Sequence, residues 1–293
     1  KLLEEWMRSY RPEELFDEEG RLGDLVRQAN PEKPMSMSGT PHANGGLLRR
    51  ELDLPDFREL AIDVPQRAAT KAESTRKLGE LMKAAYERNP DNFRLFCPDE
   101  ANSNRVGAVF DVSDRAWMEG VTADDVKIGP SGRVMEVLSE HSCHGWLEGY
   151  TLTGRHGLFA TYEAFAMVSA SQTVQHAKWL QESLHLPWRA KVPSLNILLS
   201  STAWRNDHNG FSHQGPGLIQ VALNQGSDVN RIYLPPDANC LLHVADHCFR
   251  STSYVNLIVI DKQPQPQWLS MDEAIAHCTK GASIWEWAGS PEG

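Results

Sequence analysis

One short stretch of the chain, WRNDHNGFSHQGPG from Trp204 to Gly217, concentrates side chains that carry protons or bind anions. It holds two His, two Asn, an Asp, an Arg and a Gln among three Gly and a Pro, and it follows the apolar run SLNILLSST. Imidazoles titrate near neutral pH, and imidazole and amide groups donate hydrogen bonds to phosphate oxygens. The composition suits an oxyanion or a sugar phosphate, although a polar loop that caps the next helix has the same features.

A second group of ionisable residues consists of Glu140, His141 and His144. Glu140 directly follows the apolar run VMEVLS, where a helix is expected to begin, and a helix N-terminus favours a carboxylate even without catalysis. The two histidines are three residues apart, so they share one face of that helix. Histidines in this position are more often packing residues with hydrogen bonds than ligands.

A third group, HVADH, places His243 and His247 four residues apart on an expected helix. This spacing is half of a zinc site, but the Glu of an HExxH motif is missing and no third ligand is indicated. A metal-dependent hydrolase would therefore depend on two residues alone. The sequence also has no P-loop, no GxGxxG after a strand and no GxSxG elbow, so it does not support a nucleotide-binding or serine-hydrolase function.

The elements that must position these groups alternate along the chain. Short apolar runs predict strands at 93–97, 133–139, 157–161, 195–201, 231–235 and 255–261. Helices are predicted at about 72–88, 141–153, 162–185, 216–224, 237–250 and 271–279. Apolar strands separated by helices indicate a doubly wound α/β domain, with a mostly parallel sheet of about six strands and helices on both faces.

In such a sheet, ligands bind beyond the carboxyl ends of the strands. Four polar clusters occupy these positions, namely CPDEANSNR, SEHSCHG, YEAF and the stretch from Trp204 to Gly217. We therefore expect them to lie along one edge of the sheet and to form one site.

Composition excludes several classes of protein. The 293 residues, 41% of them hydrophobic, can bury a large core, and a net charge of −10 without a basic stripe argues against a nucleic-acid partner. The apolar runs are shorter than the roughly 20 residues that span a membrane. The five cysteines form no CxxC pair, which predicts reduced, mostly buried thiols and a cytoplasmic location. The chain begins at Lys1, inside the helical pattern KLLEEWMRSY, so we expect a segment of a longer polypeptide.

Several longer motifs resemble one enzyme family. In order, LSEHSCHGWLEGY, TGRHGLFATYEAF, QHAKWL, WRNDHNGFSHQGPG and KQPQPQW resemble the central region of the phosphoketolases, and PHANGG and CPDEANSNR extend the similarity toward the N-terminus. The resemblance covers essentially the whole chain. It implies a thiamine-diphosphate enzyme that acts on xylulose 5-phosphate and fructose 6-phosphate.

The resemblance also implies a domain plan. Residues 1–60 would be an interdomain linker with an active-site loop, and residues 61–293 would be the pyrimidine-binding domain with the start of a linker to a missing C-terminal domain. The diphosphate motif and the Mg²⁺ ligands are expected in a missing N-terminal domain, so no metal ligand is assigned here. In this fold class the cofactor lies between two subunits, which implies a homodimer or a larger assembly and an inactive isolated chain.

The family's functional residues map onto this sequence one by one. Glu140 matches the glutamate that hydrogen-bonds N1′ of the aminopyrimidine, and Phe165 matches the ring that stacks on it. His213 matches a histidine at the reacting centre, and His42 matches a linker histidine that reaches the site. Positions that line the substrate and phosphate end of the pocket correspond to Tyr162, His208, Asn209, Glu100 and Ser103.

The implied reaction cleaves the ketose phosphate with inorganic phosphate. The products are acetyl phosphate and either glyceraldehyde 3-phosphate or erythrose 4-phosphate. One position departs from the family: Gly215 stands where an Asp is usual, which leaves the loop geometry and the sugar preference open. A non-catalytic relative that keeps the fold for assembly or regulation is the alternative, although a scaffold has no physical reason to keep Glu140, Phe165 and His213 together.

Overall fold

The computed structural model describes residues 1–33, 35–98, 101–203, 212 and 214–290, in two compact units, Lys1–Asn44 and Gly45–Gly293. The first unit contains the helices α1 (Leu2–Arg8) and α2 (Asp24–Ala29) and the short 3₁₀ helices η1 (Pro12–Glu14) and η2 (Met37–Gly39). A further 3₁₀ helix, η3 (Pro41–Leu48), includes the PHANGG motif. Short 3₁₀ turns thus accommodate the Pro, Ser and Gly residues of this stretch.

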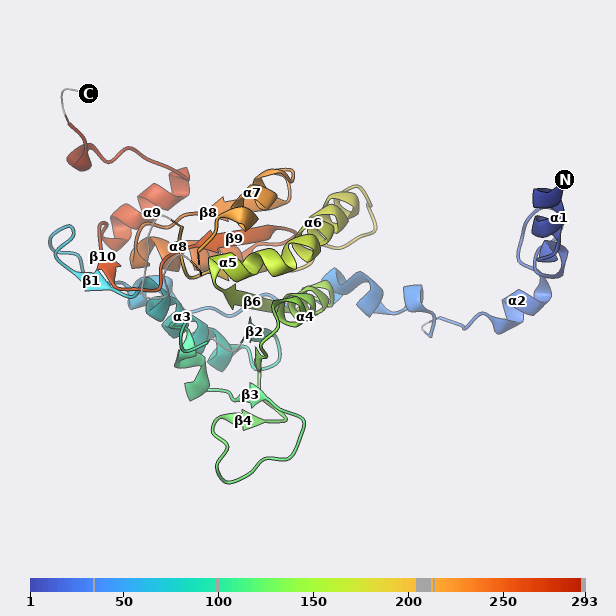
Figure 1. The fold of residues 1–293 in the computed structure, drawn as a ribbon, viewed down its shortest axis with the longest axis horizontal. Helices are drawn as coiled ribbons and strands as arrows, with labels where there is room; N and C mark the ends of the chain where they lie inside the picture. The colour runs from blue at the N-terminus through green and yellow to red at the C-terminus, as the bar shows by residue number, and fades with distance from the viewer. Residues whose placement is uncertain (34, 99–100, 204–211, 213, 291–293) are drawn as a thin grey trace. The chain divides into compact units, whose positions relative to one another are not determined.

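The second unit is built on a parallel sheet. Within the described residues, eight strands pair in the order β4-β3-β5-β2-β6-β7-β9-β8, and every pairing is parallel (Figure 1). In chain order, the strands are β2 (Phe93–Cys97), β3 (Arg115–Ala116), β4 (Ile128–Gly129), β5 (Val134–Glu136), β6 (His156–Thr161), β7 (Leu195–Leu199), β8 (Asn230–Tyr233) and β9 (Val255–Val259). The predicted α/β class and parallel sheet are confirmed.

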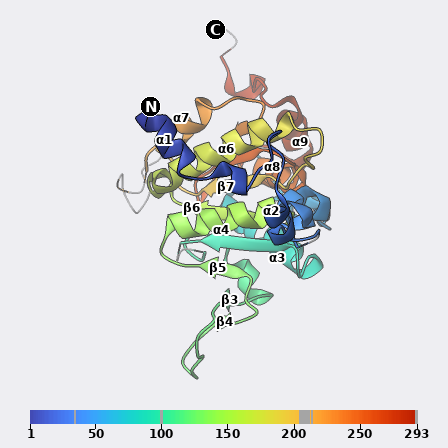
Figure 2. The same ribbon diagram turned by 90° about the vertical axis from the view of Figure 1, so that its right-hand side faces the viewer.

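All six predicted strands are present, and two more extend the sheet. The strands β3 and β4 are two residues long each and continue the sheet beyond β5, where Figure 2 shows them projecting away from the helices. Arg115 pairs through its backbone with Val134, and its side chain forms an ion pair with Glu136. A strand of two residues is too short to show a hydrophobic period, so β3 and β4 could not be predicted from the sequence pattern.

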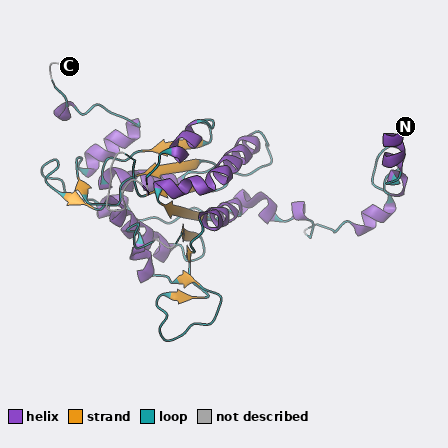
Figure 3. Cartoon of the chain, in the orientation of Figure 1, coloured by secondary structure: helices purple, strands orange, loops and turns teal. Residues whose placement is uncertain are grey.

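Helices cover both faces of the sheet (Figure 3). They are α3 (Ser74–Arg88), α4 (Glu140–Leu152), α5 (Glu163–Ala166), α6 (Ala170–Leu184), α7 (Gly217–Leu223), α8 (Ala238–Arg250) and α9 (Met271–Lys280). Side chains along each strand alternate between two cores: Leu95 and Cys97 pack with α3 and α8, whereas Phe96 packs with α4, α6 and α7. This alternation follows from the two-residue period of a strand and fixes which helix lies on which face.

The predicted helix at 162–185 is not continuous. It consists of α5, the 3₁₀ helix η6 (Met167–Ser169) and α6. The Ser169 hydroxyl donates to the Ala166 carbonyl at 3.1 Å, at the point where the 3₁₀ turn joins α6. Such a bond competes with the regular helical pattern.

The remaining described elements are short. They are the two-residue strands β1 (Lys71–Ala72) and β10 (Gln265–Pro266), which pair antiparallel, and the 3₁₀ helices η4 (Phe57–Leu60), η5 (Gly107–Asp111) and η8 (Glu286–Ala288). All five cysteines are free and mostly buried, as predicted. In the part of the chain that the structure describes, no helix has the length and apolar character that crossing a membrane requires.

Candidate functional site

The carboxyl ends of the parallel strands meet at one edge of the sheet, as the strand-end rule requires. Ser103 follows β2, Glu140 follows β5 and Tyr162 directly follows β6. Lys262 follows β9, which lies two strands from β6 in the sheet. Residues far apart in sequence are therefore carried to the same edge.

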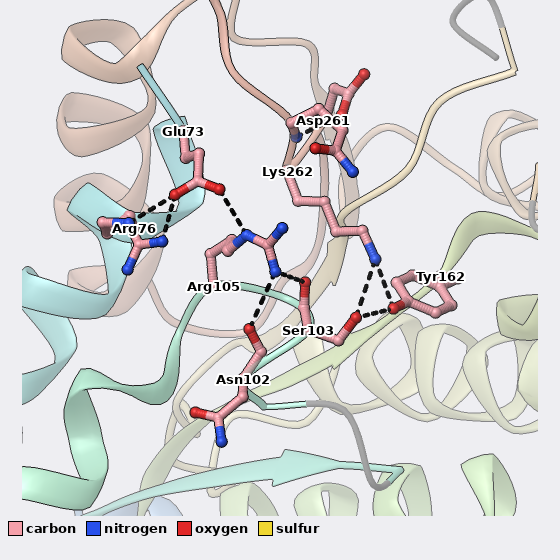
Figure 4. A network of polar contacts seen from close by, with 9 residues as sticks. Glu73, Arg76, Asn102, Ser103, Arg105, Tyr162, Asp261 and Lys262 are labelled. Carbon is pink, nitrogen blue, oxygen red and sulfur yellow. Dashed lines mark hydrogen bonds and ion pairs between the residues drawn. The ribbon is translucent and has the colours of Figure 1, made fainter. Parts of the chain in front are cut away.

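A buried lysine connects three of these strand ends (Figure 4). Lys262 has an exposed fraction of 0%, and its Nζ donates to the Tyr162 hydroxyl at 2.5 Å and to Ser103 Oγ at 3.2 Å. Nζ also lies 3.8 Å from the centroid of the Tyr162 ring, and the two hydroxyls are hydrogen-bonded to each other. The structure thus brings together Tyr162 and Ser103, two residues that the sequence placed at the substrate end of the pocket.

An arginine stands beside this network (Figure 4). Arg105 donates to the Ser103 carbonyl at 3.3 Å and to Glu73 Oε1 at 2.7 Å. Burial alone would raise the pKa of Glu73, but hydrogen bonds from Arg76 and Arg105 outweigh it, so the pKa is lowered and the carboxylate stays ionised. Arg105 itself has a left-handed backbone (φ 64°), a strained conformation that is common where a side chain is held for function.

This arrangement offers an ammonium group, a guanidinium group and two hydroxyls at one sheet edge. Such donors bind phosphate and sugar oxygens, and a buried setting strengthens each bond. Lys262 and Arg105 were not among the predicted site residues. Arg105 ends the quoted cluster CPDEANSNR and Lys262 follows a predicted strand, so the strand-end rule applied to single cations would have found both.

Glu140 is the first residue of α4, as its position after an apolar run predicted. Ser139 caps the helix by accepting from the Ser142 amide at 3.3 Å, and the Glu140 side chain is half-buried at the carboxyl end of β5. Because β5 and β6 both pair with β2, Glu140 and the residues after β6 lie at the ends of strands that flank β2. A carboxylate at this place can hold a proton on a ligand that enters from the edge.

Phe165 lies in α5, close to the lysine network. Its ring is half-buried, and its centroid lies 6.1 Å from that of Tyr162 at an interplanar angle of 49°. A partly exposed aromatic ring at the sheet edge can stack on a flat ligand.

Glu163, between these two aromatic residues, was not predicted to have a role. It has an exposed fraction of 0%, and Oε2 accepts from the Gly215 amide at 3.0 Å. Burial raises the pKa of Glu163, although hydrogen bonds from the Gly215 and Ala203 amides act in the opposite direction. The YEAF motif places a carboxylate soon after an apolar strand, where it needs a partner if the fold buries it, and that burial is evident only from the structure.

The other predicted residues cannot be placed in this site. Glu100, His208, Asn209 and His213 lie outside the described residues. His42 belongs to the Lys1–Asn44 unit, where it is exposed and its Nδ1 lies 3.2 Å from Thr40 Oγ1. Its expected reach into the site stays a prediction.

His144 is a packing residue with hydrogen bonds, as its spacing favoured. Its exposed fraction is 0%, its Nε2 lies 3.0 Å from Thr173 Oγ1, and its Nδ1 lies 3.2 Å from Glu148 Oε1. His176 is buried in the neighbouring helix α6, and burial lowers its pKa from 6.5 to about 4, despite the nearby Glu148. The two histidines and Glu148 form a buried polar cluster between α4 and α6.

This cluster makes stability depend on pH. In the unfolded chain His176 takes up a proton with a pKa of 6.5, but in the folded chain only near pH 4. The neutral, buried form of His176 therefore contributes its full share to the free energy of unfolding above pH 6.5, and this share, about 3 kcal/mol, is lost as the pH falls toward 4. Burial lowers the pKa of His156 as well, so it acts in the same direction. Denaturant unfolding at a series of pH values should therefore show a shallower acid slope for His176→Gln, and an unchanged slope would contradict this assignment.

In the structure, the two histidines of the HVADH motif contact other residues. His243 makes an edge contact with the Phe57 ring at 5.5 Å, and His247 Nε2 lies 3.4 Å from Arg231 Nη1. Within the described ranges, no three His, Cys, Asp or Glu residues lie close enough to hold a metal ion. The described geometry therefore does not support the hypothesis of a metal-dependent hydrolase.

Comparison with protein families decides the relationship. The model described as D-xylulose 5-phosphate/D-fructose 6-phosphate phosphoketolase matches residues 76–251, which is more than half of the 293 residues. The chain belongs to this family. Two further models, described as the XFP N-terminal domain and the XFP C-terminal domain, match residues 1–48 and 262–293. The resemblance inferred from the motifs is confirmed.

Curated phosphoketolases are similar over the whole chain. The probable phosphoketolases of Bradyrhizobium diazoefficiens and Synechococcus elongatus are 54% and 56% identical over 100% of this chain. The probable phosphoketolase 2 of a Nostoc species is 54% identical over the same extent. This chain spans 37% of the length of each of these three relatives.

Solved transketolases share the fold of this chain. A Pichia stipitis transketolase in complex with sedoheptulose 7-phosphate aligns with a TM-score of 0.56 and 18% identity, over 82% of this chain and 33% of the other. The Leishmania mexicana transketolase aligns with a TM-score of 0.53 and 15% identity, over 81% and 31%. At this level of identity the likeness establishes the fold alone.

Proposed function

We propose that this chain is the pyrimidine-binding part of a phosphoketolase. The complete enzyme would convert xylulose 5-phosphate and inorganic phosphate to acetyl phosphate, glyceraldehyde 3-phosphate and water. With fructose 6-phosphate, the second product would be erythrose 4-phosphate. The observation that carries the proposal is the Lys262–Tyr162–Ser103 network, in a chain that belongs to the phosphoketolase family.

The network suits the phosphorylated substrates. Both substrates of this reaction carry phosphate, and a buried ammonium group beside two hydroxyls supplies directed donors for phosphate oxygens. Arg105 adds a second positive charge next to Ser103. A phosphate group that hydrogen-bonds to this network would gain strong charge-assisted bonds because the surroundings are buried.

The residues at the edge also fit the aminopyrimidine of thiamine diphosphate. Glu140 and Phe165 are both half-buried near the ends of strands that flank β2, and a carboxyl group that can share a proton, together with an aromatic face that can stack, suits a flat nitrogen heterocycle. When bound, thiamine diphosphate would supply a carbon nucleophile for the ketose carbonyl. Glu140 would share a proton with the ring nitrogen N1′, and Phe165 would hold the ring in place.

The remaining assignments complete the proposal. His213 and His42 would move protons near the reacting carbon, and phosphate contacts would come from His208, Asn209 and Glu100. Residues 1–60 would form the linker and 61–293 the pyrimidine-binding domain. The Mg²⁺ ligands and the diphosphate site would lie elsewhere in the complete polypeptide, which would act in the cytoplasm as a dimer or larger assembly.

Product formation tests this function. The complete polypeptide, supplied with thiamine diphosphate, Mg²⁺, phosphate and either sugar phosphate, should form acetyl phosphate and the matching aldose phosphate in equal amounts. Acetyl phosphate can be trapped as its hydroxamate, and the aldose phosphate can be measured with a coupled dehydrogenase. Turnover that does not require phosphate would contradict the proposal. No turnover with either sugar would also contradict it and would favour a non-catalytic relative.

A further inference from the structure

Glu163 occupies an unusual position for a carboxylate. It is the first residue of α5, it has an exposed fraction of 0%, and in the sequence it lies between Tyr162 and Phe165, to which the proposed function assigns ligand binding. Among the described residues, its Oε1 has no hydrogen-bond partner. A buried carboxylate lowers the stability of the fold unless hydrogen bonds compensate for its lost hydration. The contacts of Glu163 therefore indicate its role.

The contacts of Glu163 join three separate segments. Its backbone amide donates to Ser201 Oγ at 3.0 Å, just after β7. Its carboxylate accepts from the Gly215 amide at 3.0 Å, two residues before α7 begins, and interacts with the Ala203 amide. One residue therefore ties the end of β7 and the approach to α7 to α5, the helix that contains Phe165 and begins directly after Tyr162.

We propose that Glu163 is a positioning residue for substrate binding. By holding Ser201 after β7 and Gly215 before α7, it fixes these two residues relative to Tyr162 and Phe165. This role rests on the proposed function, because it matters to catalysis only if Tyr162 and Phe165 bind the ligands assigned to them. Without the carboxylate, the Gly215 amide would lose its acceptor and the approach to α7 would be released from α5, whereas the bond from the Glu163 amide to Ser201 would remain.

The geometry at Gly215 supports the proposed role of its backbone amide. A Cβ atom built at Gly215 would lie 3.8 Å from Ala164 Cα, an ordinary van der Waals distance. The site therefore has room for the first atom of a side chain, and what the structure uses at this position is the backbone amide. An Asp in place of Gly215 would keep that amide, so the anchor does not depend on which of the two residues is present.

Two substitutions in the complete polypeptide test the role. Glu163→Ala removes both acceptor oxygens, whereas Glu163→Gln has nearly the same shape and keeps one. Hydrogen exchange of peptides that cover residues 214–223 should become about tenfold faster or more in the alanine variant and change less in the glutamine variant. The KM for sugar phosphate and for phosphate should rise about tenfold or more in the alanine variant, with a smaller change in kcat and partial recovery in the glutamine variant.

Controls separate this role from a general loss of structure. Glu182→Gln replaces an exposed carboxylate on α6 and should leave exchange and kinetics unchanged. If Glu163→Ala unfolds, the nearly isosteric glutamine variant still tests the proposal, because its exchange and KM should lie above wild-type values. Unchanged exchange at 214–223 would overturn the anchor, and faster exchange with wild-type KM would overturn the positioning role. If the wild-type protein forms no acetyl phosphate, the proposed function fails, and the exchange data still decide the anchor by themselves.

Discussion

Replacing Lys262 by methionine should raise the KM for phosphorylated substrates by about 10- to 100-fold. Methionine fills much of the same space but removes the charge that contacts Tyr162 and Ser103. A hydrogen bond to a charged group contributes about 1.5–3 kcal/mol, which corresponds to this range. The two hydroxyls would still bond to each other, so the fold should be retained.

Initial rates measured against both substrates show which phosphate group Lys262 serves. A rise confined to the sugar phosphate would place its phosphate group at the network, whereas a rise confined to inorganic phosphate would place the second substrate there. The matched control is Lys83→Met, since Lys83 forms a half-exposed ion pair with Asp111 that contributes little. Wild-type KM values for both substrates in Lys262→Met would show that the network does not bind phosphate.

Glu140→Gln should lower kcat by about 10²- to 10⁴-fold, the usual contribution of a positioned acid–base group. Glutamine keeps the size of the side chain and its place at the start of α4, but it cannot exchange a proton with a ring nitrogen. Affinity for thiamine diphosphate, measured by fluorescence quenching, should change much less than kcat. This contrast separates proton transfer from binding.

The control for this variant is Glu87→Gln, which changes an exposed carboxylate on α3. It should have wild-type kcat. If Glu140→Gln kept wild-type turnover, the proposed role of Glu140 would be wrong.

Most of the fold could be predicted because the core elements have strong periodic patterns. The strand at 93–97 was predicted with the bounds that the structure shows. The predicted helix at about 72–88 corresponds to α3, whose apolar residues at helical spacing are all fully buried: Leu78, Leu81, Met82 and Ala85. The pairs β3–β4 and β1–β10 were missed, since two residues carry no period and such strands depend on the backbone of their neighbours.

The site could be predicted only in part, for a related reason. Polar clusters after strands pointed to Ser103 and Tyr162, which do meet. Lys262 opens the quoted motif KQPQPQW, but its contact with Ser103 and Tyr162 depends on the strand order β2-β6-β7-β9, which no local pattern specifies. The partners of Glu163 likewise come from segments far along the chain, so its burial became evident only in three dimensions.

The central proposal is that the Lys262–Tyr162–Ser103 network binds the phosphate group of a substrate, in a chain that belongs to the phosphoketolase family. The most direct measurement is acetyl phosphate formation by the complete polypeptide, followed by ³¹P NMR as phosphate and sugar phosphate are varied in turn, in wild type and Lys262→Met side by side. We predict phosphate-dependent acetyl phosphate in the wild type and a large loss in the variant below saturation. Equal rates in the two proteins at low substrate, or no acetyl phosphate in the wild type, would contradict the claim.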